Sequence, residues 1–140
     1  MQKFKVGIAG VGIGKEHILA YQQLPEMFEV TAVTAATLAE AQTAADIYNI
    51  PHADANFDAL CARDDIDIIN ICTPNHLHVP QALQALVAGK HVVLEKPVAG
   101  SLAGVDRLIE AEAASGKRLM PIERKKSLAS CCALTSKPSK

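Results

Sequence analysis

The chain has 140 residues, of which 49% are hydrophobic and 21% charged, a composition typical of a folded domain rather than a disordered or fibrous chain. Its formal net charge is -1, so the charge balance does not indicate a nucleic-acid partner. No apolar run approaches the roughly 20 residues of a membrane span, and no signal peptide is recognisable. The four cysteines lack the spacing of a disulfide framework. We therefore expect a cytoplasmic protein that binds neither membrane nor nucleic acid.

Charge divides the chain into two parts. Residues 1–120 carry 9 Lys and Arg against 14 Asp and Glu, whereas the last twenty residues carry 5 basic residues and one acidic residue. The apolar periodicity stops at about the same place. We predict a domain over residues 1–121 and an atypical basic tail over residues 122–140 that is unstructured, with the Cys131-Cys132 pair inside it.

Short apolar runs alternate with helix-length segments along the predicted domain. Strands are expected over 5–9, 29–33, 66–71, 91–94 and 117–120, and helices over 14–23, 38–48, 79–88 and 102–115. Thr37 and Glu40 match a capping box, in which Thr37 caps the second helix and Glu40 reaches back. Ser101 is expected to cap the last helix, and Gly89 and Gly116 to end the third and the last. This alternation predicts an α/β fold with a doubly wound parallel sheet and helices on both faces.

A glycine loop, Gly10-Val11-Gly12-Ile13-Gly14, lies between the first strand and the first helix. Gly10 would allow a tight turn, and Gly12 would let the backbone approach a pyrophosphate at the helix N-terminus. The usual spacing is GxGxxG, but here the third glycine comes one residue early and Lys15 occupies the expected position. The loop indicates a dinucleotide site, and the alternative is a glycine turn with no ligand.

The acidic residue that normally follows the second strand of a dinucleotide site is missing. That position falls on Thr34-Ala35-Ala36-Thr37, and the first acid after it is Glu40. Without a carboxylate, a 2′-phosphate is not repelled, and the hydroxyls of Thr34 and Thr37 are available to bind it. The cofactor is therefore NAD or NADP, with NADP favoured, although no arginine stands ready to clamp the phosphate. The alternative is that affinity for the adenosine has been lost.

The stretch IDIINICTPNHLHVPQALQALVAGKHVVLEKP, residues 66–97, is the most specific part of the chain. With GVGIG…H at Gly10 to His17, its TPNHLH, AGKHV and EKP pieces occur in the order found in the Gfo/Idh/MocA (glucose–fructose oxidoreductase / inositol dehydrogenase) family. The chain resembles the N-terminal domain of that family over roughly residues 4–121. The resemblance implies a Rossmann-type NAD(P)-binding domain of an oxidoreductase acting on CH-OH groups. It also implies that the second, substrate-binding domain of such enzymes is absent from these 140 residues.

By resemblance and by their place at strand ends, twelve residues are candidates for cofactor binding: Gly10, Gly12, Ile13, Gly14, Thr34, Ala35, Thr73, Pro74, Asn75, His78, Glu95 and Lys96. Lys96 is also the candidate catalytic residue, because an ammonium near the nicotinamide can polarise or relay a proton from an alcohol. In the family, the proline after this lysine often follows a cis peptide bond. The alternative for Lys96 is a surface lysine after a strand.

The histidines give no metal site by their spacing. Cys72, His76 and His78 form a C-x3-H-x-H cluster, which lacks a recognisable zinc spacing, so no metal is expected. His17, early in the first helix, is left open between a surface role and a ligand contact.

Two functions from different classes follow. The first is the cofactor half of an enzyme that transfers hydride between a nicotinamide and a sugar or polyol. Three explanations of the length compete: a frameshifted or truncated gene, which is favoured, a deliberately short cofactor-binding protein, or a cloning scar. We expect weak or absent catalysis by this chain alone, because one wall of a site cannot hold two reactants in attack geometry. The alternative is a non-catalytic NAD(P)-binding or sensing module that recruits a partner through the tail. An α/β fold without a nucleotide is a third reading.

Overall fold

The fold alternates strands and helices over residues 2–122, the part of the chain that this computed structural model describes. The elements are β1 (Phe4–Ala9), α1 (Gly14–Gln22), β2 (Phe28–Thr34), α2 (Leu38–Tyr48), β3 (His52–Ala53), α3 (Phe57–Cys61), β4 (Ile68–Ile71), the 3-10 turn η1 (Asn75–Leu77), α4 (His78–Val87), β5 (His91–Glu95), α5 (Leu102–Ser115) and β6 (Leu119–Ile122).

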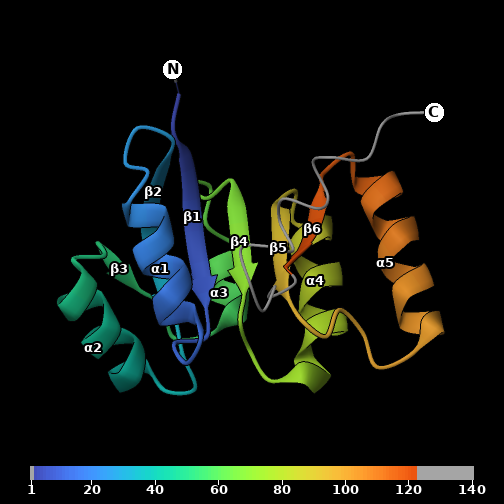
Figure 1. Ribbon diagram of the computed structural model, residues 1–140, viewed down its shortest axis with the longest axis horizontal. Helices are drawn as coiled ribbons and strands as arrows, with labels where there is room; N and C mark the ends of the chain where they lie inside the picture. The colour runs from blue at the N-terminus through green and yellow to red at the C-terminus, as the bar shows by residue number, and fades with distance from the viewer. Residues whose placement is uncertain (1, 123–140) are drawn as a thin grey trace, which may run out of the picture.

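Six parallel strands form one sheet in the order β3-β2-β1-β4-β5-β6. The chain builds outward from β1 to β3, and then returns to the other side of β1 to begin β4. Neighbouring β1 and β4 therefore mark the point at which the strand order reverses, and their carboxyl ends lie at the lower edge of the sheet in Figure 1. The predicted doubly wound parallel α/β fold is confirmed.

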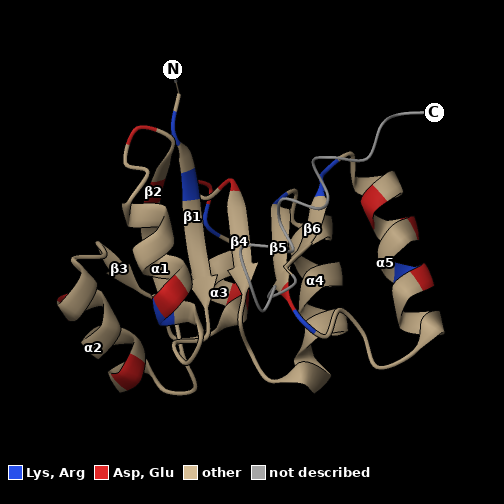
Figure 2. Cartoon of the chain, in the orientation of Figure 1, with Lys and Arg blue, Asp and Glu red and all other residues tan. Residues whose placement is uncertain are grey.

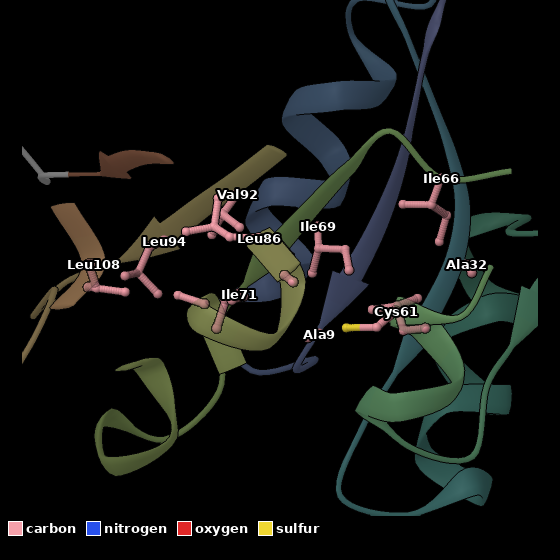
Figure 3. Close-up of a cluster of buried hydrophobic side chains, with 13 residues drawn as sticks. Ala9, Ala32, Cys61, Ile66, Ile69, Ile71, Leu86, Val92, Leu94 and Leu108 are labelled. Carbon is pink, nitrogen blue, oxygen red and sulfur yellow. The ribbon is translucent and has the colours of Figure 1, made fainter. Parts of the chain in front are cut away.

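Each face of the sheet has its own core. Val6 and Ile8 of β1 pack with Ile18 of α1 and with two alanines of α2 on one face. The larger core, on the other face, joins the sheet to α3, α4 and α5, and Figure 3 shows Ile69, Ile71, Val92 and Leu94 pointing into it. Alternation of side chains along each strand sends one set to each face, which is why the strands are apolar on both sides.

Local signals account for most of the element ends. The hydroxyls of Thr37 and Ser101 accept hydrogen bonds from Glu40 N and Gly104 N, as expected of N-caps. Gly89 and Gly116 have φ of 79° and 69°, the left-handed conformation that ends a helix after α4 and α5. The reciprocal half of the capping box is absent from the hydrogen bonds of residues 2–122, so the prediction that Glu40 reaches back is wrong.

Three short elements, β3, α3 and the turn η1, were not predicted from the sequence. β3 has two residues and α3 has five, both too short for a hydrophobic period to show. Asn56 nevertheless caps α3, because its side chain accepts a hydrogen bond from Ala59 N at 2.8 Å. At the other end of the domain, Ile122 belongs to β6 and pairs with Glu95, one residue beyond the predicted boundary. The remainder of the predicted tail, residues 123–140, lies outside the described residues, and Cys131-Cys132 with it.

Charged residues lie mainly at the strand ends and on the outer surfaces of the helices, whereas the middle of the sheet carries few (Figure 2). Lys90, directly before β5, is buried at such a strand end: it is 7% exposed, and its ammonium donates to the carbonyl oxygens of Arg63 and Ile66. None of the helices within residues 2–122 has the length and apolar character needed to cross a membrane.

The substitution Leu60→Ala tests whether α3 belongs to the core. The Leu60 side chain is fully buried, so Leu60→Ala should lower the free energy of unfolding by about 2–5 kcal/mol through lost contacts and a residual cavity. Urea denaturation followed by circular dichroism measures this. A loss below about 0.5 kcal/mol, the range of an ordinary surface substitution, would contradict the placement of α3.

Candidate dinucleotide site

A cleft of about 560 Å³ opens where the carboxyl ends of β1, β2 and β4 meet. Open α/β sheets bind ligands at such reversal points, because the loops there diverge and leave a crevice. The cleft is lined by Gly10, Val11, Gly12, Thr34, Ala35, Ala36, Glu40, Phe57, Cys72, Thr73, Pro74, Leu77 and Gln81.

Gly10 brings the loops after β1 and β4 into contact. Its φ is 95°, and a Cβ at this position would lie 2.4 Å from the Cys72 carbonyl oxygen. That distance is a steric clash, so a residue with a side chain does not fit here. Gly10 N donates to Thr34 O at 3.0 Å, and Cys72 N donates to Ala9 O at 2.7 Å. The tight turn predicted for Gly10 is therefore present, and it joins the ends of three strands.

Gly12 leaves open space in front of the first helix. A Cβ built there would meet nothing within 4 Å, so folding does not require a glycine at this position. No side chain caps α1 at Ile13. Lys15 N and Glu16 N donate to Gly12 O and Ile13 O, whereas the hydrogen bonds of residues 2–122 include none from Gly12 N, Ile13 N or Gly14 N, so these three are available to an anion. Gly14 instead serves packing, since its Cβ would lie 3.2 Å from Ile8 Cγ2. A backbone cradle of this kind fits a pyrophosphate.

The predicted cofactor residues fall into two groups. Six of them line the cleft: Gly10, Gly12, Thr34, Ala35, Thr73 and Pro74. The other six do not: Ile13, Gly14, Asn75, His78, Glu95 and Lys96. Ile13 and Gly14 form the start of α1, and Asn75 is exposed at the start of η1.

His78 lies behind the cleft lining rather than in it. Its ring is 1% exposed, with Nδ1 2.7 Å from Pro97 O and Nε2 2.8 Å from Thr73 O. It therefore ties the loop after β4 to the loop after β5. We interpret His78 as a residue that positions these two loops, and its contact with a cofactor stays a prediction.

Glu95 is similarly engaged inside the protein. It is 7% exposed at the end of β5, with Oε1 2.7 Å from His17 Nε2 and Oε2 3.0 Å from Lys96 N. Lys96 itself is exposed, and its peptide bond to Pro97 is cis. Among the hydrogen bonds and ion pairs within residues 2–122, none engages the Lys96 ammonium, so it is available to a ligand.

A buried polar network extends from α1 to β4. Asn70 is fully buried in β4, and its side-chain oxygen lies 3.2 Å from His17 Nδ1 and 2.9 Å from the Tyr21 hydroxyl that donates to it. Its amide nitrogen donates to Cys72 Sγ at 3.0 Å. Burial raises the pKa of the Cys72 thiol to about 12, with a further contribution from the Glu95 charge, and burial likewise raises the pKa of Tyr21 to about 12. Both groups therefore stay protonated near neutral pH.

Sequence reasoning missed three residues of this network: His17 as a structural partner, Tyr21 and Asn70. The available signal was Asn70, a single polar residue inside the apolar strand run at its carboxyl end, since a buried amide requires partners. Between residues 2 and 122 no group of three or more His, Cys, Asp or Glu side chains is arranged to hold a metal ion.

The fold and the glycine cradle together define an α/β domain of the dinucleotide-binding class. The chain belongs to the Gfo/Idh/MocA oxidoreductase family, because the family model, described as an oxidoreductase family with an NAD-binding Rossmann fold, matches residues 4–123.

Relatives in this family include proteins named inositol 2-dehydrogenase and levoglucosan dehydrogenase. An inositol 2-dehydrogenase from Salmonella typhimurium is 38% identical over 120 residues, which cover 84% of this chain and 36% of that protein. A levoglucosan dehydrogenase from Pseudarthrobacter phenanthrenivorans is 37% identical over 107 residues, covering 71% of this chain and 27% of that protein. The chain thus spans about a third of the length of such relatives.

Solved structures agree in fold and include both cofactors. A levoglucosan dehydrogenase in complex with NADH superposes with a TM-score of 0.81 at 29% identity, over 86% of this chain and 34% of that chain. A 3-ketoreductase from Actinomadura kijaniata in complex with NADP and TDP-benzene gives a TM-score of 0.81 at 29% identity, over 86% of this chain and 37% of that chain.

Alanine substitutions at Gly10 and at Gly12 distinguish a glycine that the fold requires from a glycine that cofactor binding requires. Gly10→Ala should destabilise the fold, because its Cβ collides with the Cys72 carbonyl. Gly12→Ala should leave the unfolding midpoint unchanged while it weakens NADH binding tenfold or more, about 1.4 kcal/mol, because the methyl group occupies the space of the phosphate. Thermal unfolding and calorimetric titration measure the two effects. Unchanged NADH affinity in a folded Gly12→Ala variant would contradict the cradle.

Proposed function

We propose that this chain is the cofactor-binding part of an oxidoreductase that transfers hydride between a nicotinamide dinucleotide and a CH-OH group of a sugar or polyol. The observation that carries the proposal is the open cradle at Gly12, which has no role in folding and lies at the sheet's reversal point. The names of the relatives, inositol 2-dehydrogenase and levoglucosan dehydrogenase, support the substrate class.

Different residues of the chain would bind different parts of the dinucleotide, according to their position in the cleft. The N-terminus of α1 and the loop from Gly10 to Gly14 hold the pyrophosphate, and Thr34 and Ala35 lie beside the adenosine ribose. Thr73, Pro74 and Asn75 flank the nicotinamide half. A bound nicotinamide supplies the hydride acceptor. Lys96 would take the proton from the substrate hydroxyl as the amine, which becomes the ammonium, and as the ammonium it would return that proton in the reverse direction.

The described residues provide one side of a substrate site. The cleft is open, and Lys96 is the one acid–base group proposed at its nicotinamide end. Hydride transfer needs both reactants held in a near-attack geometry, so we propose that residues outside this domain complete the substrate pocket. In the relatives, about two thirds of the length lies outside the matched region.

Titration of the full 140-residue chain with NADH and with NADPH in a calorimeter tests this function. We expect saturable one-site binding, but turnover of inositol and other polyols far below the ordinary enzyme rate of about 10 s⁻¹. Circular dichroism first establishes that the protein is folded. Absence of heat with either cofactor would overturn the function, whereas turnover near the ordinary rate would contradict only the need for a further part of the pocket.

The choice between the two cofactors depends on Glu40. The expectation of NADP relies on free threonine hydroxyls and no acid, and it stays a prediction. However, Thr34 is 4% exposed and the Thr37 hydroxyl caps α2. Glu40 borders the cleft next to Ala35, and its carboxylate is not used in the capping box. Lys15 shares with Glu40 only the neighbouring groove between α1 and α2. These features support NAD, with Glu40 bonding the ribose hydroxyls in place of the missing acid.

Glu40→Gln tests this preference. Two unit charges 4 Å apart in water interact by about 1 kcal/mol, so removing the carboxylate near a 2′-phosphate should improve NADPH affinity roughly fivefold. NADH affinity should fall, because a charge-assisted hydrogen bond becomes a neutral one. Glu110→Gln, on the exposed surface of α5, is the matched control. An unchanged ratio of NADH to NADPH affinity in Glu40→Gln would contradict the role of Glu40.

A further inference from the structure

The main chain of Lys96 is held in place while its side chain is free. Lys96 N donates to Glu95 Oε2 at 3.0 Å, a hydrogen bond between neighbours that fixes the direction of the chain as it leaves β5. Pro97 follows and has no N–H to donate. The Lys96–Pro97 segment is therefore held by this hydrogen bond and by the contact of Pro97 O with His78 Nδ1. The orientation of the Glu95 carboxylate therefore helps to fix the position of the Lys96 backbone nitrogen.

His17 holds that carboxylate from the other side. Its Nε2 lies 2.7 Å from Glu95 Oε1, and the two side chains are 12% and 9% exposed, so little water competes for the contact. His17 comes from the first turns of α1, whereas Glu95 ends β5. The contact therefore connects the helix that begins at the glycine loop with the segment that carries Lys96.

The other ring nitrogen of His17 is oriented by Asn70. The amide nitrogen of Asn70 donates to Cys72 Sγ, which turns its oxygen toward His17 and Tyr21. The contacts of the two ring nitrogens of His17, with Asn70 on one side and Glu95 on the other, set the plane of the ring. On the far side of Lys96, His78 Nδ1 meets Pro97 O at 2.7 Å. Two histidines from α1 and α4 thus flank the Lys96 segment.

We infer that His17 is a positioning residue for Lys96, acting through the Glu95 carboxylate. The inference rests on the proposed function for the meaning of Lys96, but the contact itself exists without a cofactor. Its consequence is that α1 serves both ends of the site: its N-terminus faces the pyrophosphate cradle, and its His17 orients the group proposed to move the substrate proton. Displacement of α1 would then change both ends together.

Hydrogen exchange of the Lys96 amide, followed by NMR on the full chain without cofactor, tests this inference. In His17→Ala the Glu95 carboxylate loses its anchor, so Lys96 N–H should exchange about tenfold faster or more. His17→Gln should restore protection, because its terminal amide can donate from about the place of Nε2, whereas the shorter His17→Asn should not. His76→Ala, at an exposed position in η1, is the matched control. The Cys72 amide, bonded to Ala9 O, is the internal reference for global opening.

Equal Lys96 exchange in the wild type and in His17→Ala would overturn the inference. Faster exchange that His17→Gln fails to reverse would overturn it as well, because it would assign His17 a packing role only. If Cys72 accelerates in parallel with Lys96, the change is global unfolding and the comparison is made between His17→Gln and His17→Asn. Failure of the wild type to bind NADH would count against the proposed function alone, since this exchange is measured without cofactor.

Discussion

The close approach of Gly10 to the Cys72 carbonyl is the contact on which the site depends. The loops that leave β1 and β4 separate at the reversal of strand order, and a side chain at residue 10 would push them further apart. With glycine there, the backbone also bonds across to Thr34 at the end of β2. The three strand ends are thereby held at one level, and the cleft opens in front of them with its walls supplied by backbone rather than by long side chains.

A second constraint is the buried polar network between α1 and the sheet. Asn70 places an amide where the neighbouring strand residues are apolar, and an unpaired buried amide would be costly. The side chain of Asn70 finds its partners in His17, Tyr21 and Cys72. His17 then extends the network to Glu95. Because such a network stabilises only when its members are all in place, it specifies the rotation of α1 against β4 and β5. The same rotation aims the N-terminus of α1 at the glycine cradle.

The sequence predicted the features that have a local cause. Thr37 and Ser101 cap helices through hydrogen bonds to residues three positions on, and Gly89 and Gly116 end helices through their own positive φ. The alternation of apolar runs was sufficient to predict a parallel sheet. The half of the cleft made by Gly10, Gly12, Thr34, Ala35, Thr73 and Pro74 was also predicted, because strand ends in this fold class converge.

What the sequence could not predict depends on long-range pairing. His17 and Glu95 are 78 residues apart, and nothing local indicates that the two meet. Glu95 and His78 were expected to face a cofactor, but their polar atoms bond within the protein. For Glu40, the capping pattern suggested a bond back to Thr37, while the structure leaves that carboxylate beside the cleft.

The central claim is that a nicotinamide dinucleotide occupies the cleft where β1 and β4 adjoin. The most direct measurement is a titration of the ¹⁵N-labelled chain with NADH, followed by amide NMR shifts. We expect shifts concentrated at Gly10, Gly12, Ala35 and Thr73, with a shift at Lys96 at the nicotinamide end. A competing apolar groove of about 500 Å³ lies between α1 and β6, lined by Leu24 and Met120 among others. Shifts confined to that groove, or no shifts in a folded protein, would contradict a dinucleotide site at the reversal of strand order.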